Sequence, residues 1–375
     1  MRPGLSVAIA GCGVAGLALA RLLAAQGHRV ALFDKLTTPQ PLGSGLILHP
    51  PGLAALDAIG AAGAEIRTLG APIRRLLGQV SATGRTVLDV RYDALGAHAP
   101  PGLAVHRGAL FGVLLRAAEQ AGVQVEAGCE VRAARSGRFE FAAGRLSARF
   151  DLLVDAMGMR SPLGGAPGRL LPFGALWTSL PWDDAFAPDR LEQRYEAARK
   201  MAGVMPIGRL DPGAPPMAAF FWSLRHVDRD AFERGGLSAW KAEVARLWPQ
   251  TQGLLDRIAS RDQLVFAAYA HRTLASPVGR GLVHVGDSWH CASPQLGQGA
   301  NMALLDALAL AQALEAYEEL DAALSAYAAM RRWHIRFYQL VTWLFTPAYQ
   351  SDSRGVAWAR DHLLAPISRI WPMPG

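Results

Sequence analysis

The stretch Ser6-Val-Ala-Ile-Ala10-Gly11-Cys-Gly13-Val-Ala-Gly16 decides the fold. Its first five residues are an apolar run with a β-branched component, and leucines at helical spacing follow its glycine turn. Gly27 then ends the predicted helix, and Arg29–Phe33 indicates a second buried strand that stops at Asp34. The order strand, turn, helix, strand predicts a βαβ unit.

The spacing of the three glycines suits a bound dinucleotide. Gly11 permits the tight turn, Gly13 lets the backbone approach a pyrophosphate, and Gly16 lets the helix pack on the strand. The helix N-terminus offers unpaired N–H groups and a partial positive charge to the anion. An acid at the end of the second strand can accept hydrogen bonds from ribose hydroxyls, and Asp34 stands 18 residues after Gly16. The predicted dinucleotide site also includes Val14, Ala15 and Lys35.

Farther along the chain, the apolar pattern indicates two kinds of structure. Residues 72–99 alternate short apolar runs with turns, which indicates antiparallel sheet, whereas residues 107–121 have a helical pattern. Residues 172–264 are rich in tryptophan and proline and contain candidate strands at Leu191–Tyr195 and Met217–Leu224. We therefore expect an α/β fold, with a Rossmann-like nucleotide-binding domain, an inserted β-rich substrate domain and a C-terminal helical segment. The expected boundaries are 1–71, 100–168 and 270–345 for the nucleotide-binding domain, 72–99 and 169–269 for the substrate domain, and 346–375 for the tail.

The composition argues against several other classes of protein. Of 375 residues, 51% are hydrophobic and 18% charged, so the chain is too apolar to be disordered. The net charge of +7 comes from arginines in no run longer than a pair, which argues against a nucleic-acid partner. Three widely spaced cysteines argue against a metal site or a disulfide framework. Glycines interrupt the N-terminal apolar run and no stretch is long enough to span a membrane, so we expect a cytoplasmic protein without stable membrane insertion.

A second glycine-rich turn lies near the C-terminus. The segment Gly281–Gly286 is predicted as a strand that ends at Asp287. The run Pro294-Gln-Leu-Gly297-Gln-Gly299-Ala300-Asn301 then leads into a nearly all-apolar helix, residues 302–314. An aspartate at a strand end and a glycine turn at a helix N-terminus are features that a nicotinamide dehydrogenase does not need at this point.

Together, the two glycine motifs resemble those of the single-component FAD-dependent aromatic hydroxylases, the family of 4-hydroxybenzoate and salicylate hydroxylase. The resemblance covers about residues 6–349. It implies that FAD is the cofactor, with its pyrophosphate at Gly11–Gly16, its adenosine ribose at Asp34, and Arg107 near the flavin. It further implies that Asp287 accepts a hydrogen bond from the ribityl chain. The pyrimidine edge of the flavin would lie along the loop that contains Pro294, Gly297, Gly299, Ala300 and Asn301.

A third motif of that family is altered in this chain. Such hydroxylases carry a pattern like Asp-Leu-Leu-Val-Gly-Ala-Asp-Gly-x-x-Ser-x-x-Arg, but Met157 replaces the second Asp and Gly164 replaces the closing Arg. Asp155 lies about 7 Å upstream on a strand and does not substitute for that acid. Because the resemblance associates this motif with FAD and the pyridine nucleotide, we expect slow flavin reduction by NADPH or NADH unless substrate is bound, with a partner flavin reductase as a further electron source. The equal alternative is an ordinary site kept by Arg160, Ser161 and Arg169.

Few side chains are needed for the chemistry, since the resemblance implies that reduced flavin and O₂ form a C4a-hydroperoxide. Tyr269 and His271 share a face of the predicted strand Val265–His271 and are candidates for polarising a substrate phenol or amine. Interface packing explains each of them equally well. His290 is better explained as tying its loop together than as a base. The candidates for an aromatic substrate pocket, or for ordinary core packing, are Trp177, Phe221 and Trp222.

Two expectations complete the sequence analysis. The basic and aromatic segment 331–344 is predicted as a helix that closes the back of the nucleotide-binding domain, and contact with a membrane surface is the alternative. The predicted function is that of an FAD-dependent monooxygenase that uses O₂ to hydroxylate a hydrophobic aromatic small molecule. The alternative is an FAD-dependent oxidoreductase, or a redox-neutral isomerase or cyclase, that inserts no oxygen, and a binding module is the third class.

Overall fold

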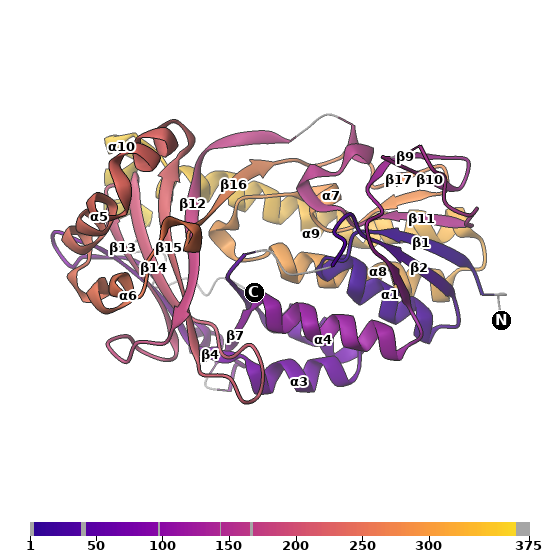
Figure 1. The fold of residues 1–375 in the computed structure, drawn as a ribbon, viewed down its shortest axis with the longest axis horizontal. Coiled ribbons are helices and arrows are strands. Elements are labelled where there is room, and N and C mark those ends of the chain that lie inside the picture. The colour runs from indigo at the N-terminus through magenta and orange to yellow at the C-terminus, as the bar shows by residue number, and fades with distance from the viewer. Residues whose placement is uncertain (1–3, 39–42, 97, 143, 166–167, 365–375) are drawn as a thin grey trace.

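The computed structural model describes residues 4–38, 43–96, 98–142, 144–165 and 168–364. Two large sheets lie at opposite ends of the molecule, and helices lie between and around them (Figure 1). The expected α/β fold class is confirmed.

The first sheet has six strands in the order β17-β18-β11-β1-β2-β8. At its centre, β1 (Ser6–Ala10) pairs in parallel with β2 (Arg29–Phe33) and with β11 (Leu152–Asp155). Parallel strands are covered on both faces, and accordingly β1 is an unbroken apolar run after its first residue. The other strands are β8 (Gln124–Glu126), β17 (Val278–Gly279) and β18 (Leu282–His284).

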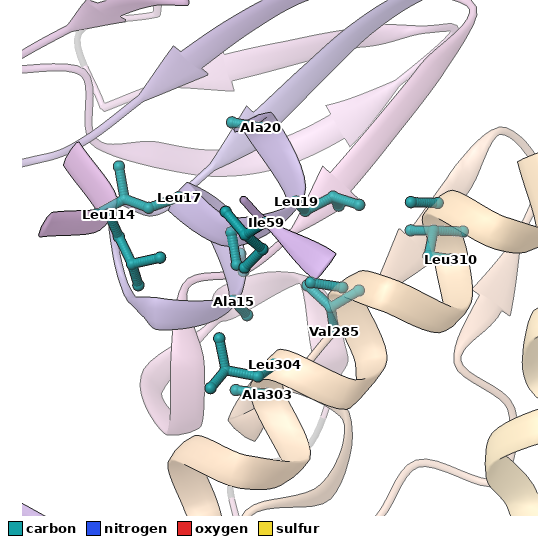
Figure 2. Packing of buried hydrophobic residues seen from close by; sticks show 14 of the residues in the cluster. Ala15, Leu17, Leu19, Ala20, Ile59, Leu114, Val285, Ala303, Leu304 and Leu310 are labelled. Atoms are coloured by element: carbon teal, nitrogen blue, oxygen red, sulfur yellow. The ribbon is translucent and has the colours of Figure 1, made fainter. Parts of the chain in front are cut away.

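Helices cover one face of this sheet and a hairpin covers the other. Figure 2 shows leucines and alanines of α1 (Val14–Ala25) near those of α8 (Gly299–Ala316), where small residues allow close packing. The same core includes residues of α4 (Arg107–Gln120), α2 (Pro50–Ala58) and α3 (Ala61–Leu69). On the opposite face, Phe139 and Phe141 of the hairpin formed by β9 (Val131–Arg135) and β10 (Arg138–Phe141) contact Phe33.

The second sheet has seven strands in the order β16-β12-β15-β14-β13-β5-β6. Phe220 and Trp240 belong to the core between this sheet and α5 (Arg229–Leu247) with α6 (Gln252–Asp256). The strands are β5 (Arg75–Val80), β6 (Thr86–Arg91), β12 (Arg169–Pro181), β13 (Arg190–Glu196), β14 (Lys200–Pro206), β15 (Met217–Arg225) and β16 (Val265–His271). A smaller sheet of β3 (Gly45–Leu48), β7 (Gly102–His106) and β4 (Ala71–Ile73) lies between the two large ones.

The long helix α9 (Leu320–Tyr349) joins the two ends of the molecule. Tyr327, near its start, packs against Trp289, and Tyr349, its last residue, packs against Tyr195 of β13. The helix continues past residue 345, where we expected the tail to begin, although Pro347 falls in its last turn. Two short helices complete this part of the fold: α7 (Asp287–His290) precedes α8, and α10 (Arg354–Ala359) follows α9.

Candidate active site

The first glycine turn lies between β1 and α1. A side chain on Gly11, whose φ is +108°, would overlap the carbonyl of Ala156, and one on Gly16 would overlap the carbonyl of Gly11. Gly13, in contrast, faces open space. It directly precedes α1, a helix of 12 residues whose N-terminus is capped by no side chain. The turn therefore leaves free N–H groups and room for an anion at the N-terminus of α1.

Asp34 is held against this turn. Its Oδ2 accepts the N–H of Cys12 at 2.9 Å, and its Oδ1 accepts the N–H of Leu36 at 2.9 Å. Each carboxylate oxygen has a further lone pair, so the group can still accept from a sugar hydroxyl. Lys35 is exposed beside it. Burial, with Asp34 adding to the effect, raises the pKa of the Cys12 thiol to about 12, so no thiolate repels an anion here.

A cavity of about 980 Å³ is lined by residues from both parts of the molecule. The loop 287–300 and the start of α4 bound it on the side of the six-stranded sheet. Residues of β16, β15 and β13 bound it on the side of the seven-stranded sheet, and the second half of α9 closes another wall. The volume is in the range of pockets that enclose a small molecule or cofactor, about 300–1,000 Å³.

Arg107 and Asp287, far apart in the sequence, both line this cavity. The side chain of Asp287 opens onto the cavity inside the molecule, and this enclosed position raises the pKa of its carboxyl, although His290 and Arg107 oppose the rise. Of the described residues, none makes a hydrogen bond to the Asp287 carboxylate. The group is therefore placed to accept a hydroxyl from a molecule in the cavity.

The second glycine turn forms one edge of the cavity. Pro294 begins a short 3₁₀ turn, Gly297 adopts φ of +64°, and Gly299 and Ala300 open α8. All four residues line the cavity.

Asn301, which we expected at the same edge, has a side chain that points elsewhere. Its Oδ1 accepts the N–H of His49 at 2.7 Å, and its Nδ2 donates to the carbonyls of Ile47 and Gly297. It is 1% exposed and does not line the cavity. The hydrogen bonds to the backbone of residues 47, 49 and 297 direct the Asn301 side chain away from the cavity that Ala300 lines. Asn301 therefore fixes the loop instead of presenting its amide to a ligand.

His49 is a cavity residue that the sequence did not reveal. Its Nδ1 lies 2.7 Å from the hydroxyl of Tyr92, and a side chain on Gly297 would contact its Nε2. Burial lowers the pKa of His49 to about 4, so the ring is neutral at pH 7. Nothing in the sequence around Leu48 and Pro50 distinguishes this histidine from a helix-capping one.

A buried ionic network holds the strand end that carries Asp287. Asp306 of α8 is fully buried; its Oδ2 accepts the N–H of Gly286 at 2.8 Å and lies 2.6 Å from Nε2 of His290. Its Oδ1 accepts from Nε of Arg331 at 2.7 Å. Burial raises the pKa of Asp306, but His290 and Arg331 outweigh it and hold the pKa below its ordinary value. His290 thus ties the loop together, as expected. Its partner, Asp306, is marked in the sequence as an acidic residue within an otherwise apolar helix.

The opposite wall carries an aromatic group around Tyr269. The indole N–H of Trp177 donates to the Tyr269 hydroxyl at 2.9 Å, and Trp177 stacks on Phe221 with 4.5 Å between ring centroids. All three line the cavity. Burial raises the pKa of Tyr269 well above its ordinary value, so it is a neutral phenol. Since its oxygen already accepts from Trp177, its O–H is left to donate.

Two of the sequence candidates lie outside the cavity wall. Trp222, a candidate for the pocket or for core packing, is a core residue. Neighbouring strand residues face opposite sides, so Trp222 belongs to the outer core with Trp240 while Phe221 faces the cavity. His271 does not line the cavity either, because β16 leaves the wall after Ala270. Burial lowers the pKa of His271, and its Nδ1 has no partner among the described residues.

Comparison with known proteins decides the family. A model described as "FAD binding domain" matches residues 4–149 and 256–338, which hold both glycine turns. The chain belongs to this FAD-binding family. The expected resemblance and the cofactor FAD are confirmed, and the chain is an FAD-dependent monooxygenase.

Proteins similar to this chain align with most of its length. A probable 2-heptyl-3-hydroxy-4(1H)-quinolone synthase, AqdB2 of Rhodococcus erythropolis, is 26% identical over 339 residues, which are 86% of this chain and 83% of that protein. An FAD-dependent urate hydroxylase of Klebsiella pneumoniae is 26% identical over 343 residues, 86% of this chain and 85% of that protein. The solved structure of P. aeruginosa PqsL in complex with 2-aminobenzoylacetate has the same fold, with a TM-score of 0.80 at 19% identity over 95% of this chain and 99% of that chain.

The altered motif of this family member is rebuilt around a buried carboxylate. Asp155 is fully buried; its Oδ1 accepts the N–H of Met157 at 3.0 Å, and its Oδ2 accepts the hydroxyl of Ser161 and lies 2.8 Å from Nδ1 of His284. Asp155 thus points into the interior and fixes the turn.

This chain has glycine at position 164, where the family motif closes with arginine, but a guanidinium from another element lies nearby. A side chain on Gly164 would overlap the guanidinium of Arg272, which follows β16. Arg272 is 7% exposed, and its Nε and Nη2 have no hydrogen-bond partner among the described residues. The sequence could not show this contact, because the two residues are far apart in the chain.

Proposed function

We propose that the protein hydroxylates an aromatic or heteroaromatic ring that carries an apolar substituent. The observation that supports this most directly is the cavity, which joins the flavin-loop residues 294–300 to the aromatic group of Trp177, Phe221 and Tyr269. The cavity is also lined by apolar side chains, namely Leu76, Leu88, Leu191, Met201, Met205 and Phe345. Relatives named for a heptyl quinolone and for urate act on ring systems of suitable size.

The residues proposed to hold FAD come from both glycine turns. The open N–H groups from Gly11 to Gly16, including those of Val14 and Ala15, would bind the pyrophosphate, and Asp34 with Lys35 would bind the adenosine ribose. Arg107 and Asp287 would face the flavin and its ribityl chain. When bound, FAD supplies electrons and activates O₂.

The protein's own contribution is to orient the ring and to exclude water. We assign the orienting hydrogen bond to the Tyr269 hydroxyl, which receives the Trp177 N–H and keeps its own proton to donate to a ring carbonyl or hydroxyl. The N-terminus of α8 directs a partial positive charge toward the loop 297–300, which favours negative charge there. The apolar walls keep water from the reacting atoms.

Isotope labelling tests the proposal against the alternatives. The holoenzyme is incubated under ¹⁸O₂ with a reductant and a set of rings: 2-alkyl-4(1H)-quinolones with short and long chains, kynurenine and urate. Incorporation of one ¹⁸O atom into a ring product supports the proposal. A converted product without ¹⁸O favours the oxidoreductase, isomerase or cyclase alternative.

A pair of variants tests the role of Tyr269. Tyr269→Phe removes only the hydroxyl and should lower kcat/KM by about tenfold to a hundredfold, the value of one hydrogen bond of ~1.5–3 kcal/mol. Trp222→Phe, on the opposite face of the sheet, is the control and should leave kcat/KM close to wild type. Equal activity of Tyr269→Phe and the wild type contradicts the assignment.

A further inference from the structure

The outer face of α9 carries an apolar stripe formed by Met330, Trp333, Phe337, Leu340, Trp343 and Leu344. Each of these side chains is more than half exposed. Their spacing of three and four residues places them on one side of the helix, at the spacing that normally faces a protein core. The inner side of α9 already packs on the protein through Tyr327, Arg331 and Ile335, so the helix has a second apolar face.

The charged side chains of α9 beside this stripe are all positive. Arg332 and Arg336 are exposed, and both guanidinium groups lie over the Trp333 ring, 5.3 Å from its centroid. No aspartate or glutamate occurs from Ala322 to Ser351. Arg331, the third arginine of the segment, turns inward to Asp306. A surface with apolar and aromatic residues and only basic charge suits an anionic lipid surface, with tryptophan at the level of the headgroups.

The helix that carries the stripe also bounds the cavity. Tyr338, Val341, Thr342 and Phe345 line the cavity from the inner side of α9, and Phe337 belongs to both the stripe and the lining. One helix therefore separates the outer apolar face from the space proposed for the substrate. No helix in the described part of the chain is long and apolar enough to cross a membrane.

We propose that the stripe docks the protein reversibly on an anionic lipid bilayer, so that an apolar substrate passes from the bilayer into the cavity beside Phe337. The route of the substrate rests on the proposed function, whereas the docking does not. A second copy of the chain is a poorer occupant. In a two-fold dimer through this face, the arginines of both copies would lie in one interface, and the segment from Ala322 to Ser351 offers no carboxylate to pair with them.

Vesicle co-sedimentation of the full-length holoenzyme, without any substrate, tests the docking. We expect binding to vesicles of phosphatidylcholine with phosphatidylglycerol, weaker binding to phosphatidylcholine alone, and loss of binding as salt is raised. Arg332→Gln with Arg336→Gln should weaken the vesicle partition coefficient by about fivefold for each arginine removed. Trp333→Ser with Leu340→Ser should abolish vesicle binding, because it removes two apolar side chains of the stripe. FAD content should be unchanged, because neither side chain lines the cavity.

A matched control uses arginines on another surface. Arg132 and Arg135 of β9 are exposed, and Arg132→Gln with Arg135→Gln removes the same charge from the chain. This control should bind vesicles like the wild type. Equal loss in both arginine pairs, or no vesicle binding by the wild type, overturns the proposal. A concentration-dependent dimer in sedimentation velocity that Trp333→Ser with Leu340→Ser dissociates also overturns it, in favour of a second copy. The vesicle assay measures no turnover, so it tests the docking alone. If the protein binds vesicles but the ¹⁸O₂ experiment gives no hydroxylated product, the proposed function is rejected and the docking is kept.

Discussion

Replacing Asp306 by asparagine tests whether the buried network holds the second glycine turn, where we propose that the flavin binds. The wild-type carboxylate accepts from Gly286, His290 and Arg331 and has no exposed surface. Asparagine has the same size, but it removes the negative charge and directs an N–H₂ group at one or more donors. The guanidinium of Arg331 is then left in the interior without its counter-charge. Removing one partner of a buried ion pair costs about 3–5 kcal/mol.

We expect the free energy of unfolding of Asp306→Asn, measured in urea by tryptophan fluorescence, to fall by about 3–5 kcal/mol. FAD should also dissociate more readily, because the N–H of Gly286, beside Asp287, loses its acceptor. The double variant Asp306→Asn with Arg331→Met removes both ions, so it should be more stable than Asp306→Asn alone. An Asp306→Asn protein that unfolds at the wild-type urea concentration and retains FAD equally well would refute the reasoning.

The remaining predictions concern the cofactor, pH and the electron source. Gly13→Val should fold but lose FAD, because its side chain would enter the open space needed by the pyrophosphate; full FAD occupancy would place the first motif elsewhere. Asp34→Ala should weaken FAD binding to the apoprotein by about 1–3 kcal/mol in a fluorescence titration, and an unchanged Kd would exclude the ribose contact. Folding lowers the pKa of the Asp306 carboxyl. The stability that this group contributes is present above its unfolded pKa of about 3.9 and is lost as pH falls through the folded pKa. The free energy of unfolding of Asp306→Asn in urea should therefore depend less on acid pH than that of the wild type. Anaerobic stopped-flow mixing with NADPH or NADH should bleach the flavin slowly unless substrate is present. Reduction at roughly 1–1000 per second without substrate would show that Met157 and Gly164 change only the local packing and do not impair flavin reduction.

The parts of the fold set by neighbouring residues could be predicted from the sequence. The expected strands Ser6–Ala10, Arg29–Phe33 and Val265–His271 have those bounds in the structure. Each is a short apolar run bounded by a glycine, a charge or a turn, so its limits are local. The strand β14 was not predicted. Its glycine, proline and methionines are weak strand formers, and pairing with β13 and β15 decides its structure.

The side chains that the sequence misplaced depend on contacts between distant segments. Phe221 and Trp222 are chemically similar, and the sheet that contains them is covered on both faces, so no polar alternation tells which one faces the cavity. Asn301 is directed by the backbone of His49, which lies in another part of the chain. The roles proposed for the two FAD turns, in contrast, follow from spacing along the chain.

The exchange between Gly164 and Arg272 restricts how this sequence can change. The guanidinium of Arg272 occupies the space that a side chain at position 164 would fill, so a larger residue there fits only if Arg272 moves. We expect Gly164→Arg to be tolerated better together with a small residue at position 272 than alone, because the single change brings two guanidinium groups together. The effects of substitutions at positions 164 and 272 should therefore be non-additive, since the two residues compete for one space.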